Sequence, residues 1–471
     1  MTTRYEQLAG EISQLIESGV LRPGERIPSV RATCRSRSMS PATVMHAYGL
    51  LEDRGLISTQ PRSGYYVNAL SRALPPEPEV TRPSRRTVAV DVNDLVFEVL
   101  EATRDRRLVP LGSPFPSPLL FPLARMGRLL GAAGRRFDPW LTVDSLPLGS
   151  GELRRQIARH YLESGVILSP EDIVITTGAL EALNLCLQVV TRPGDVVAVE
   201  SPAFYGALQA VEAMGLRAVE IPTHPREGVS LAALGTALDR HDVKACWFMT
   251  NFQNPLGSTM PEEKKRDLVQ MLSRRGIPLV EDDVYAELYL DGERPKPAKA
   301  YDRGGIVMHC SSFAKCLAPG YRVGWTAPGR FTQAVERRKL MSTISTSIPP
   351  QLAIAAYLKS GGYERHLRNL RQAFASQRAK IVEAIGRGFP AGTRVTRPRG
   401  GYFLWVELPA SVDALGLHRS ALEEGISVAP GPMFSAKREY RNCLRINYGH
   451  PWTARTKDAI AVLGGLINAM L

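Results

Sequence analysis

Lys315 is the residue around which this sequence could organise covalent chemistry. It stands in the segment Cys310-Ser-Ser-Phe-Ala-Lys-Cys-Leu-Ala-Pro-Gly-Tyr-Arg-Val-Gly-Trp325, in a loop that follows a β-type run. The amine of such a lysine can form a Schiff base with an aldehyde cofactor. This chemistry also needs a holder for a phosphate dianion, a carboxylate that keeps a pyridine nitrogen protonated, donors for the ring phenolate and a flat side chain over the ring.

The sequence supplies a candidate for each of these needs, and each candidate stands beside a predicted strand. The candidates for holding phosphate are Ser312, Arg322 and the backbone amides of the loop that runs through Gly178, Ala179 and Leu180. The candidates for the ring and the substrate are Asp282 for the pyridine nitrogen, Asn254 and Tyr285 for the phenolate oxygen, Phe204 for the ring face and Arg445 for an amino-acid carboxylate.

Each of these residues, taken singly, is also compatible with a purely structural role. A lone lysine is most often solvated, Asn254-Pro-Leu-Gly257 is a common type of turn, and Asp282 can cap a helix. Arginines form ordinary ion pairs, and aromatic side chains fill ordinary cores. Six motifs in one order, each next to a predicted strand, make the joint cofactor interpretation the stronger one.

Short β-branched runs alternate with helical patterns through the long C-terminal part of the chain. The runs cover residues 172–176, 195–199, 245–249, 278–280 and 305–308. Runs of this kind between helices predict a mainly parallel, buried sheet. The fold class is therefore predicted to be α/β, with the candidate residues beside the ends of its strands.

The first 67 residues show a separate pattern of three helices followed by a hairpin. Apolar residues recur on one face of a first helix, Ser29 can cap a second helix, and Ser40-Pro41 can begin a third. The stretches 56–59 and 65–67 read as the two strands of a hairpin. Three helices and a hairpin in this order predict a winged helix-turn-helix.

Charge in this unit supports a role in DNA binding. Residues 22–37 contain five arginines and one acidic residue, so their local charge is 5 − 1 = +4. Cationic side chains replace the counterions of DNA phosphates, although an arginine cluster alone also fits a solvated surface. The residues predicted to face DNA are Arg31, Arg35, Ser40, Thr43 and His46 on the second and third helices, and Arg62 and Gly64 in the wing.

Composition divides the 471 residues into three parts and limits the function classes. Residues 1–67 carry the winged helix, residues 68–107 read as a proline-rich linker with a possible helix from about residue 91, and residues 108–471 form the large unit.

The formal net charge of +13 favours an anionic partner. Six scattered cysteines without a CxxC pair exclude a disulfide scaffold. With no apolar run of about 18 residues and no apolar leader, we expect no membrane span and a cytoplasmic location.

The N-terminal unit resembles the GntR regulators in three segments, Leu21–Arg31, Ser40–Tyr48 and Leu50–Ile57. The resemblance implies that Arg31 holds a phosphate or a base, and that Ser40 and Thr43 lie at the DNA surface. Pro41 stands where the family often has an arginine, which removes one expected guanine contact.

The large unit, residues 108–471, resembles the fold-type I aminotransferases in the motifs quoted above. The resemblance implies pyridoxal 5'-phosphate as cofactor, with Lys315 as the aldimine lysine and the other candidates in the roles already given. It also implies a large domain at about 140–340, a small domain from 108–139 and 341–471, and a dimer. Phe204 stands where that family commonly stacks a tyrosine, and Tyr205 follows it.

The two halves together resemble the MocR regulators over essentially the whole chain. The combination implies a bacterial, homodimeric transcription factor that binds operator DNA and senses an amino acid or an amine through an external aldimine at Lys315. Two alternatives stay open. One is a working aminotransferase with an accessory DNA-binding domain, and the other is a regulator whose ligand is the cofactor itself, with Arg445 idle.

Overall fold

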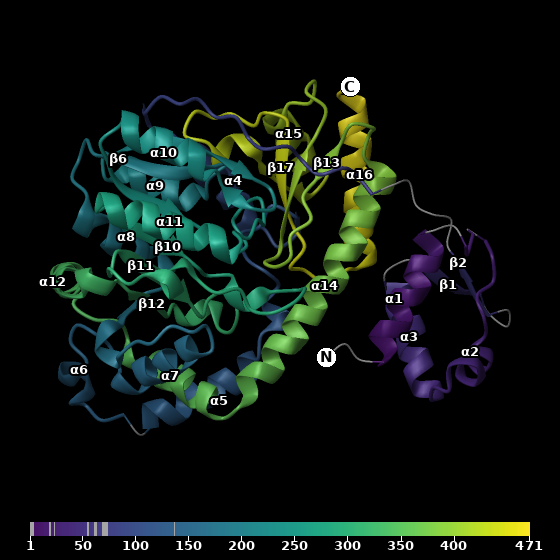
Figure 1. Ribbon diagram of the computed structural model, residues 1–471, viewed down its shortest axis with the longest axis horizontal. Helices are drawn as coiled ribbons and strands as arrows, with labels where there is room; N and C mark the ends of the chain where they lie inside the picture. Colours follow the sequence, from purple (N-terminus) through teal and green to yellow (C-terminus); the bar gives the residue numbers. More distant parts are fainter. Residues whose placement is uncertain are drawn as a thin grey trace.

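The N-terminal unit of the computed structural model is the predicted set of three helices and a hairpin (Figure 1). The structure describes residues 4–17, 20–22, 24–53, 56–60, 64–67, 74–135 and 137–471. The N-terminal elements are α1 (Arg4–Glu17), α2 (Val30–Arg37), α3 (Pro41–Asp53), β1 (Ile57–Gln60) and β2 (Gly64–Val67). β1 and β2 pair antiparallel. Buried residues of α1, α3 and both strands share one small core, and the partly buried Val30 and Cys34 of α2 pack against it.

Hydrogen bonds at the helix starts explain why α2 and α3 begin where they do. The Ser29 hydroxyl accepts a hydrogen bond from the Ala32 amide at 3.2 Å, and the Ser40 hydroxyl accepts one from the Thr43 amide at 3.2 Å. Both predicted caps are therefore confirmed. The buried Tyr48 hydroxyl donates to the carbonyl of Pro28 at 2.6 Å and fixes α3 to the chain that precedes α2.

The predicted linker lies along the surface of the large unit from residue 74 onward. The strand β3 (Val88–Ala89) pairs with the main sheet, and the helix α4 (Asn93–Glu101) follows, continued by one 3₁₀ turn, Ala102–Arg104. The helix is shorter than the predicted stretch from residue 91 to about 108. It ends where the carboxylate of Asp105 accepts a hydrogen bond from the Arg107 amide at 2.9 Å and so turns the chain.

The main sheet is predominantly parallel, as predicted. Its order is β3-β7-β6-β9-β10-β11-β12-β5. β7, β6, β9, β10 and β11 pair in parallel, whereas β3 and β12 run antiparallel to their neighbours. The strands are β5 (Val174–Thr176), β6 (Val196–Ser201), β7 (Arg217–His224), β9 (Val243–Phe248), β10 (Leu279–Asp282), β11 (Val307–Ser312) and β12 (Gly324–Ala327), and the short β8 (Gly228–Val229) pairs with β7.

Helices bury both faces of this sheet, which explains why its strands read as apolar runs. Alternate residues of β6 show the two layers, because Val197 and Val199 join one core and Ala198 joins the other. The first layer contains α8 (Ala179–Val190) and α9 (Tyr205–Ala213), and the second contains α10 (Leu231–Arg240) and α11 (Glu262–Arg275).

The last third of the chain builds a second, smaller sheet with its own helices. Its strands are β13 (Arg394–Val395), β14 (Phe403–Glu407), β16 (Ala429–Pro430) and β17 (Cys443–Asn447). The helices are α14 (Gly362–Gly388), α15 (Ala414–Glu423) and α16 (Ala454–Ala469), and β15 (Ile426–Ser427) pairs with β4 (Val109–Pro110).

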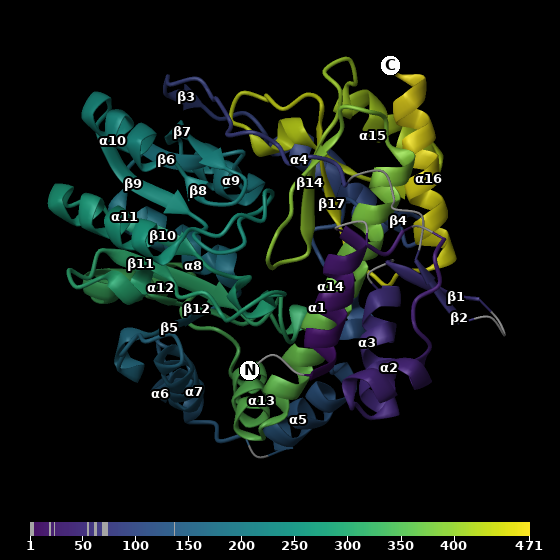
Figure 2. The same cartoon turned by 45° about the vertical axis from the view of Figure 1, so that its right-hand side comes forward.

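The long helix α14 connects the parts of the molecule. Figure 2 shows it running past the winged helix, and α3 lies against it. Its lower end meets the helices α5 (Leu123–Arg135) and α13 (Ile348–Lys359), which pack on each other and, through α13, on α7 (Gly151–Leu162). The helices α6 (Leu141–Asp144) and α12 (Thr332–Ser342) lie on the side of the large unit that is away from the winged helix (Figure 1). None of the helices in the described ranges is long and apolar enough to cross a membrane.

Candidate cofactor and ligand site

The predicted cofactor residues meet at one edge of the main sheet. β5 runs in the same direction as the parallel strands, because it is antiparallel to β12 and β12 is antiparallel to β11. The carboxyl ends of these strands therefore share an edge, which is where α/β sheets bind ligands. A cavity with an empty volume of about 970 Å³, partly open to solvent, lies there. The predicted residues that line it are Ala179, Leu180, Phe204, Asn254, Asp282, Tyr285, Ser312, Lys315 and Arg322.

Lys315 stands in this cavity three residues after β11. Its Nζ donates a hydrogen bond to the carbonyl of Pro114 at 3.1 Å and lies 4.7 Å from the centre of the Phe115 ring. Burial, with the guanidinium groups of Arg445 and Arg322 nearby, lowers the pKa of Lys315 to about 7. The neutral amine, which is the nucleophilic form, is thus well populated near neutral pH.

Asp282 is the last residue of β10 and has one unused oxygen. Its side chain is buried, and its Oδ1 has no hydrogen-bond partner among the described residues. Burial and the neighbouring Asp283 raise the pKa of Asp282 to about 7, while Lys315 opposes the shift. A buried carboxylate with a free oxygen fits a cationic donor. The protonated pyridine nitrogen of pyridoxal phosphate is such a donor.

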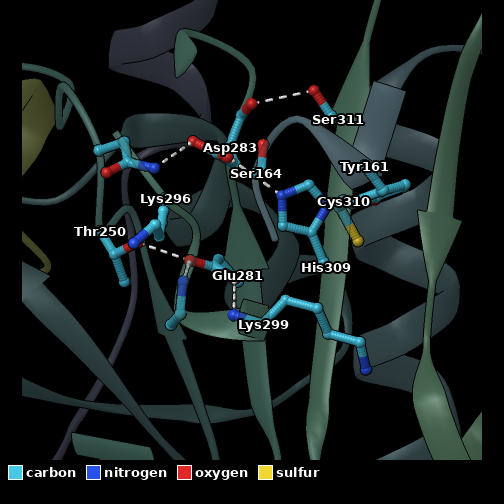
Figure 3. Close-up of polar contacts among 12 residues, drawn as sticks. Tyr161, Ser164, Thr250, Glu281, Asp283, Lys296, Lys299, His309, Cys310 and Ser311 are labelled. Carbon is cyan, nitrogen blue, oxygen red and sulfur yellow. Dashed lines mark hydrogen bonds and ion pairs between the residues drawn. The ribbon is translucent and has the colours of Figure 1, made fainter. Parts of the chain in front are cut away.

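Asp283, the residue after Asp282, belongs to a chain of buried polar contacts that was not predicted from the sequence (Figure 3). One carboxylate oxygen of Asp283 accepts a hydrogen bond from the side-chain amide of Asn251 at 3.0 Å, and its other oxygen lies 3.1 Å from Nε2 of His309. Nδ1 of His309 lies 2.6 Å from the Tyr161 hydroxyl, which accepts a hydrogen bond from the indole of Trp325 at 3.0 Å. These contacts fix the end of β10. The sequence feature that could have indicated this polar chain is the pair of consecutive acidic residues, Asp282 and Asp283, after a predicted strand.

The candidate phosphate cup lies between β5 and α8. Gly178 has φ +83 and precedes the first turn of α8, whose free amides belong to Ala179 and Leu180. A Cβ on Gly178 would stand 2.4 Å from Nη2 of Arg322, which shows how closely this guanidinium approaches the loop. Ser312, at the end of β11, is buried against the same cavity. Backbone amides, a hydroxyl and a guanidinium form a donor set that fits a phosphate dianion.

Replacing Gly178 with alanine tests this cup. We expect Gly178→Ala to weaken binding of pyridoxal phosphate by about tenfold or more, because the new methyl group displaces the Arg322 guanidinium, a charged donor worth about 1.5–3 kcal/mol. The matched control is Gly194→Ala, since Gly194 also has positive φ but a Cβ there meets nothing within 4 Å. Titration of the protein with the cofactor measures both affinities. Equal affinities in the two variants would show that Arg322 does not hold the phosphate.

Phe204, Asn254 and Tyr285, the residues predicted to contact the ring, all line the same cavity. Phe204 lies between β6 and α9, with its ring centre 4.9 Å from that of Tyr205. Both aromatic side chains line the cavity, so Tyr205 joins the predicted Phe204 in its wall. Asn254 follows β9, and Tyr285 is buried beside Asp282. The Oδ1 atom of Asn254 accepts from Arg445 at 3.3 Å, which leaves its amide nitrogen as a donor.

Arg445, on β17, is a buried guanidinium without a carboxylate partner among the described residues. It is 0% exposed, and its Nη2 donates to the carbonyl of Gly112 at 2.8 Å. Its Nε has no hydrogen-bond partner within the described ranges, and its Cζ lies 4.1 Å from the centre of the Phe403 ring. Burial lowers the pKa of this group. An uncompensated buried cation next to Asn254 fits the carboxylate of a bound amino acid.

The remaining wall of the cavity comes from residues that sequence reasoning did not identify. Leu100 and Thr103 reach it from α4 and the following turn, and Gln209 reaches it from α9. Pro114 and Phe115 form another part of this wall. No motif marked these residues, because Leu100 and Thr103 stand in the stretch predicted as linker, Gln209 stands in an ordinary helix, and Pro114 and Phe115 belong to no recognised motif.

Five of the seven predicted DNA-facing residues belong to α2, to α3 or to the cap of α3. Arg31, Arg35, Ser40 and His46 are exposed, and Thr43 is half-buried. The His46 ring lies 5.5 Å from that of Tyr5, so α1 restricts it. At the wing, a Cβ on Gly64 would stand 3.0 Å from Nε of Arg26, whereas Arg62 lies outside the described residues.

Two family models match the chain, one for each part. Residues 4–67 match the gntR family of bacterial regulatory proteins, and residues 145–462 match aminotransferase class I and II. The HTH-type transcriptional regulators YdcR and YjiR of Escherichia coli strain K12 are 47% and 41% identical. YdcR aligns over 99% of this chain and 100% of its own length, and YjiR over 98% of both.

Solved structures resemble the large unit. The α-aminoadipate aminotransferase LysN of Thermus thermophilus superposes with a TM-score of 0.72 at 30% identity. The match covers 80% of this chain and 94% of LysN. The described residues thus combine a GntR-type winged helix with a fold-type I unit, for which these relatives imply pyridoxal 5'-phosphate.

Proposed function

Because the chain belongs to the family of HTH-type regulators that join a GntR module to an aminotransferase class I and II domain, the MocR architecture, we propose that its DNA binding responds to an amino acid or an amine bound at Lys315. The regulator would act on operator DNA as a homodimer, with a mass in solution of twice the 51.7 kDa of the chain. When bound, the cofactor supplies an aldehyde and an electron-withdrawing ring. Lys315, Asp282, Arg322 and the amides after Gly178 would hold it.

The observation that carries this proposal is the position of α4. Leu100 and Thr103 line the same cavity as Lys315, and α4 is the first helix after the segment that leads from the winged helix. A ligand in the cavity would therefore touch the helix that is nearest in sequence to the DNA-binding unit. A ligand shifts the equilibrium between two conformations only if it binds one of them more tightly than the other. A contact with α4 gives the ligand such a difference if α4 lies differently in the two conformations.

The start of α4 is tied rigidly to the large unit. One carboxylate oxygen of Glu212, on α9, accepts hydrogen bonds from the amides of Val92 at 2.7 Å and Asn93 at 3.1 Å. Directly before them, Val88 and Ala89 form β3 on the edge of the main sheet. If a ligand displaces α4, the displacement would therefore be passed to β3 and to the linker that precedes it.

Apolar side chains form much of the wall of the cavity. Leu100, Phe115, Leu180 and Leu183 supply this surface, together with Pro114. Burying a matching apolar side chain would contribute roughly 1.5–3 kcal/mol. We therefore infer that the preferred effector is an amino acid with a large apolar side chain, whose carboxylate is held by Arg445.

Replacing Arg31 tests the DNA half of the proposal. Arg31→Ala should weaken binding to the operator DNA upstream of the gene and reduce the slope of log affinity against log salt by about 1, because one phosphate contact is lost. Arg337→Ala, at an exposed arginine of α12, is the matched control and should leave both quantities unchanged. Fluorescence anisotropy with labelled DNA at several salt concentrations measures them. Identical slopes in wild type and Arg31→Ala would exclude Arg31 from the DNA contact.

A working aminotransferase is the second candidate, and the arrangement of the site favours it specifically. Lys315, Asp282 and Arg445 are brought together, and these are the groups that transamination would need. One experiment distinguishes the two functions. An apolar amino acid is added to the cofactor-loaded protein, and both the affinity for DNA and the release of the corresponding keto acid are measured. A change in DNA affinity without release supports the regulator. Sustained release with unchanged DNA affinity would overturn it.

A further inference from the structure

The linker is attached along the edge of the main sheet at two places. At the first, the Thr81 hydroxyl accepts from the Thr223 amide at 2.8 Å, and the Thr81 amide donates to the Thr223 carbonyl at 3.3 Å. At the second, Val88 pairs with Ala218 and Ala89 with Arg217. The linker therefore runs antiparallel to β7 from one end of the strand to the other.

Between these two attachments the linker has more residues than the strand it follows. Residues 82–87 of the linker stand opposite residues 219–222 of β7, so six residues span the length of four. We call this stretch, which has more residues than the strand beside it, the linker bulge (residues 82–87). It is held at its middle by the His241 ring, whose Nε2 donates to the Arg85 carbonyl at 3.1 Å.

A cavity with an empty volume of about 770 Å³, partly open to solvent, lies under the linker bulge. It is bounded by β7 and by one face of α10, with Ser230 and Thr236 as hydroxyl groups on that face. Its apolar floor is formed by Val219, Ile221, Ala232, Ala233 and Ala237. Figure 1 places α10 on the opposite side of the molecule from the winged helix, so this linker cavity is separate from the cofactor cavity and from α3.

The charged residues that line this cavity are Arg85, Arg240 and Glu220. Arg85 and Arg240 line it, and neither forms an ion pair with another described residue. The acids on either side of Arg240 are engaged elsewhere, because Asp239 pairs with Arg275 at 2.9 Å and Asp242 with Lys244 at 2.7 Å.

The glutamate of β7 does not neutralise this charge. Val219 and Ile221 point toward α10, so Glu220 between them points to the opposite face of the sheet. There its carboxylate accepts hydrogen bonds from the Ser201 hydroxyl and the Ala436 amide. Arg85 and Arg240, both exposed at the edge of this cavity, thus have no counter-anion from the described chain.

We propose that the linker cavity binds a small organic anion, a carboxylate or a phosphate on an apolar body. Its anionic group would bridge Arg85 of the linker bulge and Arg240 of α10, and its body would cover the floor between α10 and β7. Such a ligand fastens the linker to the large unit from outside the cofactor site. The inference does not depend on any role of Lys315.

Phenyl phosphate and benzoate are suitable probes, with benzyl alcohol as the neutral control, added to the full chain saturated with pyridoxal phosphate. We expect calorimetric binding of at least one anion, weakened about tenfold or more in Arg240→Ala and unchanged in Arg274→Ala, at an exposed arginine of α11. A preference for phenyl phosphate would identify a phosphorylated ligand, and a preference for benzoate would identify an organic acid. An unchanged cofactor spectrum excludes binding at Lys315.

Trypsin gives a second readout, because the linker bulge contains the cleavable bonds after Arg85 and Arg86. The bound anion should slow cleavage there in wild type and in Arg274→Ala, but not in Arg240→Ala, which keeps both bonds. The proposal is overturned by equal binding of benzyl alcohol, by equal protection in Arg240→Ala, or by the absence of anion binding. Protection by double-stranded DNA but by neither anion would also overturn it and would assign the surface to nucleic acid.

Discussion

Lys315→Ala is expected to abolish the response of DNA binding to amino acids while leaving the affinity for DNA without effector close to that of wild type. The variant lacks the amine, of pKa about 7, that attaches the cofactor and exchanges with an incoming amine. The winged helix, which has its own core, is untouched. Anisotropy titrations with DNA, with and without a panel of amino acids, measure both quantities.

Lys359→Ala is the control for this variant, because Lys359 lies on the surface at the end of α13, where its Nζ contacts Glu152 at 3.3 Å. It should respond like wild type. A normal amino-acid response in Lys315→Ala would contradict the account, since the effector would then act without the cofactor linkage.

Arg445→Met is expected to weaken amino-acid binding by about 30-fold or more, since removing one partner of a buried charge pair costs about 2 kcal/mol or more. Binding of an amine without a carboxylate should not change. Methionine is chosen because an apolar side chain of similar length can pack against Phe403 and Phe434, where the guanidinium now lies. The change in cofactor absorption during titration reports both affinities.

Arg441→Met, at an exposed arginine two residues before β17, is the matched control and should bind amino acids like wild type. The same experiment separates the open alternatives. If Arg445→Met keeps the full amino-acid response, the carboxylate role of Arg445 is wrong, and the regulator whose ligand is the cofactor itself becomes the better account.

Sequence patterns predicted the centre of the sheet well, for a physical reason. β6, β9, β10 and β11 are covered on both faces, so each contains a short run of apolar residues. β7 was missed because polar residues and Pro222 interrupt it, and it lies near the edge of the sheet. β12 was missed because it is short and begins at Gly324.

The candidate site was predictable wherever a residue ends or follows a strand within a recognisable motif, as Asp282 ends β10 and Lys315 and Asn254 follow strands. Their structural positions agree with that prediction, while their roles stay predictions. The contribution of α4 could not be predicted, because Leu100 stands far from Lys315 in the sequence and only the tertiary structure brings both to one cavity. The linker bulge was equally hidden, since its position depends on pairing with β7.

The central claim is that one binding event at Lys315 controls DNA affinity. The direct test is a single titration of the cofactor-loaded protein and labelled operator DNA with an apolar amino acid, recording cofactor absorption and DNA anisotropy together. The account predicts that both signals change with the same midpoint and that Arg445→Met moves both midpoints equally. A complete change in absorption with constant anisotropy would contradict it.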